Sequence, residues 1–207
     1  MGARLSDGWI CRDTNTIVCP FHALNFDHEG RATLPNQKKT QLLLKPLELF
    51  IQEGLIWTYG NEKPKIPIPD AINNLSTNYH FVGVTGDITV NTDFLTALEI
   101  NYDYNHAKGV HRDVLRVIDL EASDFQIGQY SFVAKLKHIR GNNTIREYLK
   151  NPLLLISPPT VDLELEHYFP SCVAVYHNQP PFGRLCEVFV IYPETKTTTR
   201  MFILIFK

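Results

Sequence analysis

Cysteine, methionine and long apolar runs are scarce in this sequence, and neither sign of charge dominates it. Its 207 residues include 4 cysteines, too few and too scattered for the disulfide scaffold of a small secreted protein. The longest apolar stretches, Met201–Phe206 and Leu153–Ile156, fall far short of the roughly 20 residues that a membrane-spanning helix needs. The 20 Lys and Arg against 22 Asp and Glu offer no basic surface for nucleic acid. We therefore expect neither a membrane span nor a nucleic-acid partner.

The composition is that of a folded, soluble protein. Hydrophobic residues make up 44% of the chain and aromatic residues 11%, which is enough to bury a core. A chain of this length forms one large domain or two smaller ones. It opens with no secretion signal, and together with the low cysteine content this indicates a cytoplasmic location. In that reducing compartment, a cysteine close to a histidine suggests a metal site.

The first part of the chain predicts short strands separated by turns. Its β-prone runs lie at residues 16–18, 24–26, 42–44 and 48–59. Three prolines, Pro64, Pro67 and Pro69, then exclude a central strand or a helix, so residues 62–69 are predicted to form an extended connector. We place the domain boundary in this connector, which gives domains 1–68 and 69–207.

The second part predicts one helix followed by a long antiparallel meander. A strand is expected at residues 79–90, with Gly83 and Gly86 as bulge or turn points. A helix is expected from about Asp93 to His106, because Asn91, Thr92 and Asp93 are N-cap residues. Further strands are expected at residues 114–120, 130–138, 161–168, 171–177, 187–192 and 200–206. This order of elements predicts the α+β class, with an antiparallel sheet.

The first group of residues that could carry chemistry is the segment Cys19-Pro20-Phe21-His22. A thiolate and an imidazole three residues apart on a tight loop can face one metal centre, and the proline stiffens the loop. One alternative is a surface cysteine beside an incidental histidine. Another is a zinc site built from Cys11, Cys19, His22 and His28, although the spacing from 11 to 19 matches no common zinc finger.

The second group is Asp103, His106 and His111. Asp103 and His106 are three residues apart and would share one face of a helix. His111 would point elsewhere on an unbroken helix, but Gly109 can break the helix and let His111 turn back. Two neutral imidazoles leave open positions on a metal, and a carboxylate would complete the triad of Fe(II) oxygenases. The alternative is a pair of histidines capping the C-terminal end of a helix.

Several segments resemble one protein family, the Rieske non-haem iron oxygenases. The run CPFHALNFD at 19–27, followed by EGRA at 29–32, resembles the second ligand loop of Rieske iron–sulfur domains. The opening GARLSDG at 2–8 is similar to the segment that follows the first ligand loop, and EGLIWTYG at 53–60 is similar to the strand that closes the domain. The spacing of Asp103, His106 and His111 matches the mononuclear iron motif of the same enzymes.

The resemblance implies a terminal oxygenase alpha subunit of the aromatic-ring-hydroxylating dioxygenase type. An all-β Rieske domain would hold a [2Fe–2S] cluster, with Cys19 on one iron and His22 on the other. A helix-grip catalytic domain would hold mononuclear Fe(II) through His106 and His111. Asp103 would bridge an iron-ligating histidine and a cluster-ligating histidine of a neighbouring subunit in a homotrimer. Electrons from a reductase, with or without a ferredoxin, would let O₂ hydroxylate or demethylate an organic, aromatic or cyclic substrate.

The resemblance also implies ligands that this sequence does not contain. The first Cys-x-His loop would precede Met1, and the carboxylate iron ligand would follow Lys207, so we expect a chain truncated at both ends with half of the cluster ligands. A second hypothesis is therefore a non-catalytic remnant or a small-molecule-binding helix-grip module. Its apolar cavity would be lined by aromatic residues at five positions: Phe125, Tyr130, Phe132, Phe169 and Tyr176.

Overall fold

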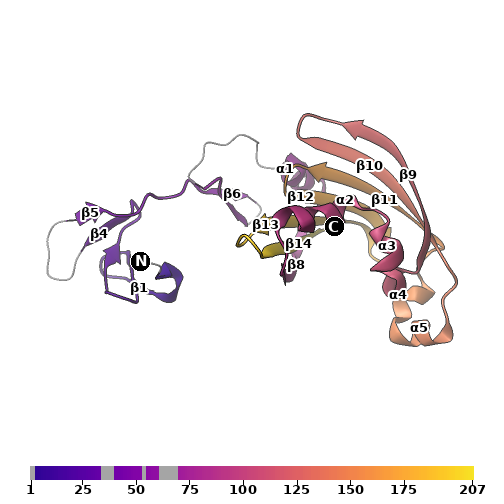
Figure 1. The fold of residues 1–207 in the computed structure, drawn as a ribbon, viewed down its shortest axis with the longest axis horizontal. Coiled ribbons are helices and arrows are strands. Elements are labelled where there is room, and N and C mark those ends of the chain that lie inside the picture. Colours follow the sequence, from indigo (N-terminus) through magenta and orange to yellow (C-terminus); the bar gives the residue numbers. More distant parts are fainter. Residues whose placement is uncertain (1–2, 34–39, 53–54, 61–69) are drawn as a thin grey trace. The chain divides into compact units, whose positions relative to one another are not determined.

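The computed structural model describes residues 3–33, 40–52, 55–60 and 70–207. The chain divides into two compact units, Met1–Lys65 and Ile66–Lys207, which are described separately below (Figure 1). The boundary expected between residues 68 and 69, and most of the proline-rich connector, lie outside the described residues.

The first unit is built from short antiparallel strands. Its larger sheet has the order β1-β2-β3-β4-β5, and a separate hairpin pairs β6 with β7. The bounds are β1 (Trp9–Cys11), β2 (Thr16–Val18), β3 (Asn25–Phe26), β4 (Arg31–Thr33), β5 (Thr40–Leu42), β6 (Phe50–Gln52) and β7 (Leu55–Trp57), preceded by a 3₁₀ turn at Leu5–Asp7. The runs predicted at 16–18 and 24–26 thus form strands, whereas the run at 42–44 is strand only at its first residue.

The turn between β3 and β4 is fixed by one side chain and one glycine. The Asp27 carboxylate accepts hydrogen bonds from the backbone N–H groups of Glu29 (3.0 Å) and Arg31 (2.9 Å). Gly30 has φ of 76°, a left-handed conformation that favours glycine. A Cβ atom at this position would lie 2.1 Å from the carbonyl oxygen of Leu44, so the backbone approach also requires glycine.

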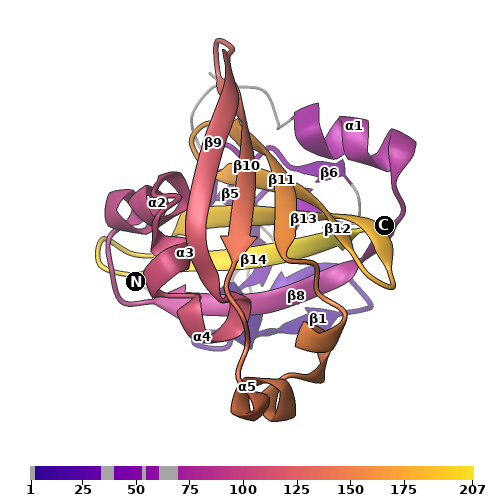
Figure 2. The same ribbon diagram turned by 90° about the vertical axis from the view of Figure 1, so that its right-hand side faces the viewer.

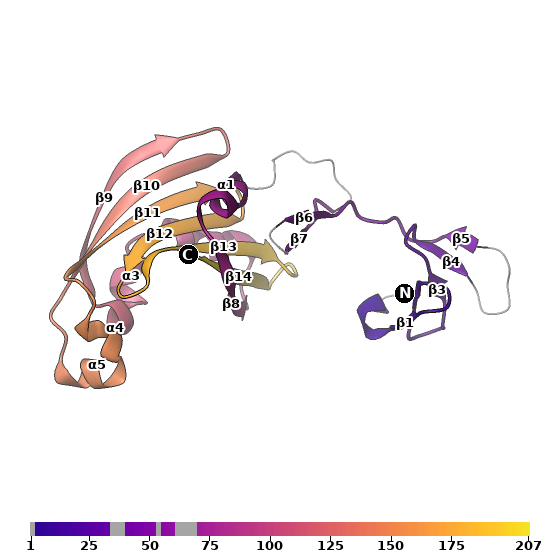
Figure 3. The ribbon, with the colours of Figure 1, turned by 180° about the vertical axis from the view of Figure 1, so that it is seen from behind.

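The second unit is a seven-stranded antiparallel sheet with helices at its ends and along one face (Figure 2). The strand order is β8-β14-β13-β12-β11-β10-β9, so β9 to β14 form the predicted meander and β8 pairs with the last strand. The strands are β8 (Phe81–Val90), β9 (Val117–Ile127), β10 (Ser131–Arg140), β11 (Thr160–Tyr168), β12 (Cys172–Gln179), β13 (Gly183–Pro193) and β14 (Thr199–Phe206). Seen from behind, β9 and β10 form a long hairpin beyond β11 (Figure 3). The predicted α+β class is confirmed.

Three short helices connect β8 to β9. They are α2 (Phe94–Tyr102), α3 (His106–Gly109) and α4 (Arg112–Leu115). The predicted cap is present, because the Asp93 carboxylate accepts from the N–H groups of Leu95 and Thr96, both at 3.1 Å. Helix α2 packs against β13 and α3 against β9, which places this segment over one face of the sheet.

Two further helices were not predicted from the sequence. Helix α1 (Asp70–Asn78) precedes β8, and α5 (Ile145–Lys150) lies between β10 and β11. A capping box opens α5, since Glu147 accepts from the Thr144 N–H (2.6 Å) and Thr144 accepts from the Glu147 N–H (3.4 Å). In the described part of the chain, no helix has both the length and the apolar character needed to cross a bilayer.

Candidate functional site

The segment from Asp103 to His111 is a pair of tight turns and not the continuation of one helix. Helix α2 ends at Asp103, whose backbone leaves helical geometry with φ of −85° and ψ of 87°. The Asp103 carboxylate then accepts a hydrogen bond from the N–H of Asn105 (3.0 Å), and its carbonyl accepts from the N–H of His106 (3.1 Å). The helix predicted to run to residue 106 is therefore wrong in its last turn, because the aspartate side chain competes for the backbone.

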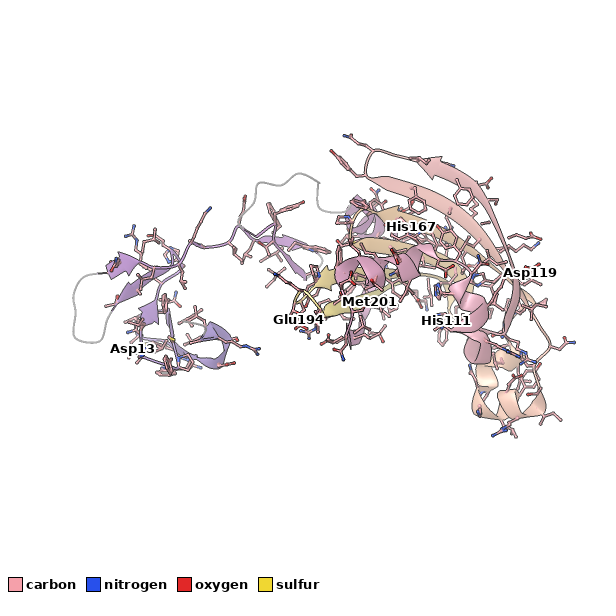
Figure 4. All side chains as sticks on the ribbon, in the orientation of Figure 1. Asp13, His111, Asp119, His167, Glu194 and Met201 are labelled. Atoms are coloured by element: carbon pink, nitrogen blue, oxygen red, sulfur yellow. The ribbon has the colours of Figure 1, made fainter. Side chains whose placement is uncertain are left out.

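The structure brings His106 and His111 together. His106 is the first residue of α3, which ends at Gly109, and His111 is the residue immediately before α4. The ring centroids of the two histidines lie 5.2 Å apart, with an angle of 68° between the ring planes. Figure 4 shows His111 at this helical connection, on the side that faces the sheet. The interruption expected at Gly109 is thus present.

The two imidazoles differ in their contacts. The Nδ1 atom of His106 makes a close contact with the carbonyl oxygen of Asp103, which can only accept, so Nδ1 is the donor and Nε2 takes no part in this contact. Burial lowers the pKa of His111, and the neighbouring His106 lowers it further. An imidazole oriented by a backbone carbonyl, as His106 is, is suited to bind a metal through its other ring nitrogen.

Both histidines line a cavity of about 450 Å³ between the helical connection and the sheet. The helices contribute residues such as Ala97, Ile100 and Val110, and the opposite wall comes from alternate residues of β8 and of β10 to β14. Most of the wall is aliphatic. Its polar side chains are Asn101, Tyr104, His106, His111, His138, Glu187 and Thr199.

One residue of this cavity, His138, was not singled out from the sequence. It lies on β10 with 8% of its surface exposed and lines the same cavity as the histidine pair. Burial lowers the pKa of His138, and the charges of His106 and then His111 lower it further. The signal was present in the alternation of β10, because Leu136 and His138 share the buried face while Lys135 and Lys137 lie on the other.

A second buried histidine, His167, supports the wall behind Tyr104. Its ring stacks between Phe132 (centroids 4.1 Å apart) and Tyr102 (4.8 Å apart), and its Nε2 lies 3.0 Å from the hydroxyl of Tyr104. The ring is 1% exposed, and this burial lowers its pKa to about 4. Burial likewise raises the pKa of Tyr104 to about 12. His167 is therefore neutral at physiological pH and holds Tyr104 in place.

Aromatic residues gather around a different cavity near the tip of the β9–β10 hairpin. This space of about 460 Å³ is lined by four of the five residues that the sequence suggested, Phe125, Tyr130, Phe132 and Phe169, whereas Tyr176 lies elsewhere. Phe125 and Phe169 are more than half exposed, so the space is an open surface hollow and not an enclosed pocket.

In the first unit, the loop after β2 carries Cys19 and His22. The N–H of Cys19 donates to the carbonyl of Leu24 (2.9 Å), and the N–H of Ala23 donates to the carbonyl of Cys19 (3.0 Å). Ala23 has φ of 54°, so the loop closes through a left-handed residue. Cys19 is buried against Phe26, whereas the His22 ring is exposed beside Phe21.

The described residues contain no group of three or more His, Cys, Asp or Glu side chains placed to hold one metal ion. The zinc arrangement of Cys11, Cys19, His22 and His28 is therefore not formed. The helical connection brings together two side chains of a type that can bind metals, His106 and His111, and the loop after β2 carries Cys19 and His22.

Comparison with known proteins agrees with these features. Residues 1–50 match the family described as the Rieske [2Fe-2S] domain. Aminopyrrolnitrin oxygenase PrnD of Pseudomonas fluorescens is 27% identical over 135 residues, which cover 60% of this chain and 37% of that protein. The chloroplastic chlorophyllide a oxygenase of Oryza sativa subsp. japonica is 33% identical over 58 residues, covering 27% of this chain and 11% of that protein.

The fold is also that of a known oxygenase structure. Dicamba monooxygenase bound to dicamba superimposes with a TM-score of 0.71 at 20% identity, covering 98% of this chain and 62% of that one. At this identity the likeness concerns the fold alone, and the chain spans less than two thirds of the length of the proteins it matches. The resemblance predicted from the sequence motifs is confirmed: residues 1–50 match the Rieske [2Fe-2S] domain, and the sequence relatives and the solved structure with this fold are oxygenases.

Proposed function

We propose that the chain is part of the oxygenase component of a Rieske-type enzyme, which uses O₂ and supplied electrons to hydroxylate or demethylate an organic substrate. The observation that carries the proposal is the pair His106 and His111, which lie 5.2 Å apart on the wall of a mostly aliphatic cavity. A redox metal beside an apolar cavity is the arrangement that oxygen insertion into an apolar molecule requires.

The donor set fits a mononuclear iron at two of its positions. His106 and His111 would hold the metal through ring nitrogens, and bound Fe(II) would supply the activation of O₂. The contact between the His106 Nδ1 and the Asp103 carbonyl fixes the tautomer that leaves Nε2 free for the metal. The cavity walls would exclude water and hold the reacting carbon near these two rings.

The first unit fits one half of a Rieske cluster site. A cluster of this kind takes two cysteines on one iron and two histidines on the other, and Cys19 and His22 would provide one of each. We assign residues 1–68 to this partial domain and residues 69–207 to the catalytic domain. Cys19, which is buried in an apolar cluster, and His22, which is exposed, would each hold the cluster by one side chain.

We propose that Asp103 acts between subunits. Its side chain is exposed, and within the described part of the chain only its Oδ1 atom has a hydrogen-bond donor, the N–H of Asn105. We infer that the carboxylate bridges an iron-ligating histidine and a cluster-ligating histidine of a neighbouring chain in a homotrimer, with electrons arriving from a reductase, directly or through a ferredoxin. Four unpaired cysteines support a reducing, cytoplasmic setting.

The second candidate is a binding module or remnant without catalysis. It is favoured by the placement of the possible ligands, because no three His, Cys, Asp or Glu side chains of the described residues are grouped to hold one metal ion. The two candidates differ in whether the cavity takes up iron.

Iron binding separates the two candidates. The full chain is titrated with Fe(II) without oxygen, and bound iron is measured after gel filtration. We expect one Fe(II) per chain, lost in His106→Ala and in His111→Ala, with unchanged circular dichroism in both variants. The matched control is His80→Ala, since His80 is exposed at the start of β8 and does not line the cavity. Equal iron retention in all three variants would reject the proposed site.

A further inference from the structure

We propose that His138 anchors the substrate through a single hydrogen bond, and that the substrate is a neutral, ring-sized apolar molecule with one polar group. The inference deepens the proposed function, because it rests on the cavity beside His106 and His111 being the substrate site. His138 projects into that cavity from the sheet wall, whereas the two other histidines belong to the helical connection.

The other polar side chains of the cavity wall are already engaged. The Asn101 amide donates to the Ala97 carbonyl (3.1 Å), the Tyr104 hydroxyl pairs with His167 (3.0 Å), and Thr199 donates to the Thr92 carbonyl (3.0 Å). Glu187 lies 3.6 Å from the Nε2 of His177. His138 is more than nine-tenths buried and lines the cavity, and its ring nitrogens are not among the fully enclosed unpaired atoms of the described residues.

A largely buried imidazole at the wall of a cavity can bind a polar group that enters the cavity. Much of the same face of the sheet is apolar and forms a packed cluster with Leu136, Leu165 and Val173, although His177 and Glu187 also lie near His138. An aliphatic residue at position 138 would continue that cluster without the desolvation cost of an imidazole. The ring is therefore suited to a partner that enters the cavity, and a neutral imidazole offers one donor and one acceptor.

The rest of the wall defines the chemistry of that partner. The described residues that line this cavity include no Lys or Arg. Arg140 lines an adjoining space that His138 also borders, where its guanidinium donates to the carbonyls of Leu115 (2.6 Å) and Pro158 (3.4 Å). The cavity lining does include the carboxylate of Glu187, which disfavours an anion. The volume of about 450 Å³ lies in the range of small-molecule sites. A phenol, an aryl amine or a cyclic ketone meets these conditions.

The test uses two probes that differ only in one polar group. p-Cresol and p-xylene have nearly the same shape, and the hydroxyl of p-cresol can pair with either tautomer of His138. Dissociation constants are measured by NMR titration on the full, metal-free chain for the wild type and for His138→Leu. We expect the dissociation constant of p-cresol to rise about fivefold in the variant, the effect of one net hydrogen bond, and that of p-xylene to change less than about twofold.

Two further variants show whether the effect belongs to the hydrogen bond. Leu136→Met alters the same strand and the same cavity without touching a polar group, so both probes should shift together. His138→Gln keeps a hydrogen-bonding group and should recover much of the p-cresol affinity. If His138→Leu does not fold, the ring ¹⁵N chemical shifts of His138 in the wild type test the hydrogen bond instead. p-Cresol should change these shifts and p-xylene should not.

The outcomes separate this inference from the proposed function. Equal weakening of both probes in His138→Leu, unmoved ¹⁵N shifts with p-cresol, or no binding of either probe to the wild type would overturn the role of His138. None of these readouts needs iron, so loss of Fe(II) binding alone would reject the oxygenase proposal and leave the His138 anchor standing.

Discussion

His167 makes the stability of the second unit depend on pH in a way that one substitution can isolate. The ring is 1% exposed, it stacks between Tyr102 and Phe132, and its pKa is about 4 against a usual value of 6.5. His167→Phe keeps an aromatic ring in the stack and removes the titration. The substitution also removes the 3.0 Å hydrogen bond with the Tyr104 hydroxyl, which lowers stability equally at every pH in the test.

The size of the pH effect follows from the two pKa values. Between pH 6.5 and pH 4 the unfolded chain binds more protons at this residue than the folded chain does. The stabilisation by neutral His167 is therefore complete above pH 6.5 and is lost as the pH falls toward 4. Since one pKa unit corresponds to about 1.4 kcal/mol, the wild type should lose about 2 kcal/mol between pH 7.5 and pH 5 through this residue alone.

The assay is urea unfolding of both proteins at several pH values. Both tryptophans, Trp9 and Trp57, lie in the first unit, so far-UV circular dichroism follows mainly the larger sheet while fluorescence follows the first unit. Subtracting the unfolding free energy of His167→Phe from that of the wild type removes the contributions of the other titrating groups, which are the same in both proteins. His80→Gln, which changes an exposed histidine of the same unit, serves as the control.

The difference in unfolding free energy between the wild type and His167→Phe should change by about 2 kcal/mol from pH 7.5 to pH 5. If this difference stays constant within about 0.5 kcal/mol, the reasoning is refuted. Such a result would mean that the ring is accessible to protons in the folded state, through a local opening of the stack.

Other substitutions test separate parts of the fold. Gly30→Ala places a Cβ against the Leu44 carbonyl at a positive φ, so it should destabilise the first unit by more than about 2 kcal/mol, seen as an earlier fluorescence transition with the circular dichroism of the sheet unchanged. Thr144→Ala removes half of the capping box of α5 and should cost about 1 kcal/mol in local stability, with faster hydrogen exchange at residues 145–150 and recovery in Thr144→Ser. Asp93→Ala removes the cap of α2 and should cost a similar amount of about 1 kcal/mol, whereas Asp93→Asn should retain most of it; equal stability of the two variants would contradict the cap.

The sheet could be predicted because its strands carry their own pattern. Alternation along β10 and β11 assigns each side chain to a face, and this places His138 and His167 on the buried side with no tertiary information. Gly86 was expected at a bulge, and the pairing of β8 with β14 is interrupted there, with Gly86 at φ of 66°. The alternation of residues along a strand does not predict which of the buried polar residues faces a cavity.

The helical connection was harder to predict because its breaks depend on side-chain hydrogen bonds. Asp103 follows the last residue of α2, and its carboxylate accepts a hydrogen bond from the N–H of Asn105, which stabilises a turn at this point. Arg116 follows α4 in a left-handed conformation with φ of 54°, where a glycine would have been the usual signal. The strand expected from residue 114 consequently begins at Val117. Helix α5 was missed although Thr144 and Glu147 have the spacing of a capping box, because its six residues are too short for a periodic pattern.

The residues of the cavity come from two sources with very different sequence spans. His106 and His111 lie within a single connection, while the wall opposite them is assembled from six strands distributed over residues 81–206. Substitutions on the strands can therefore reshape the space without disturbing the histidine pair, whose geometry depends on local turns. In the proposed function, the reaction would therefore depend on one short segment, the connection that carries the two histidines. The choice of substrate would depend on the strands, and a substitution on a single strand would be enough to change it.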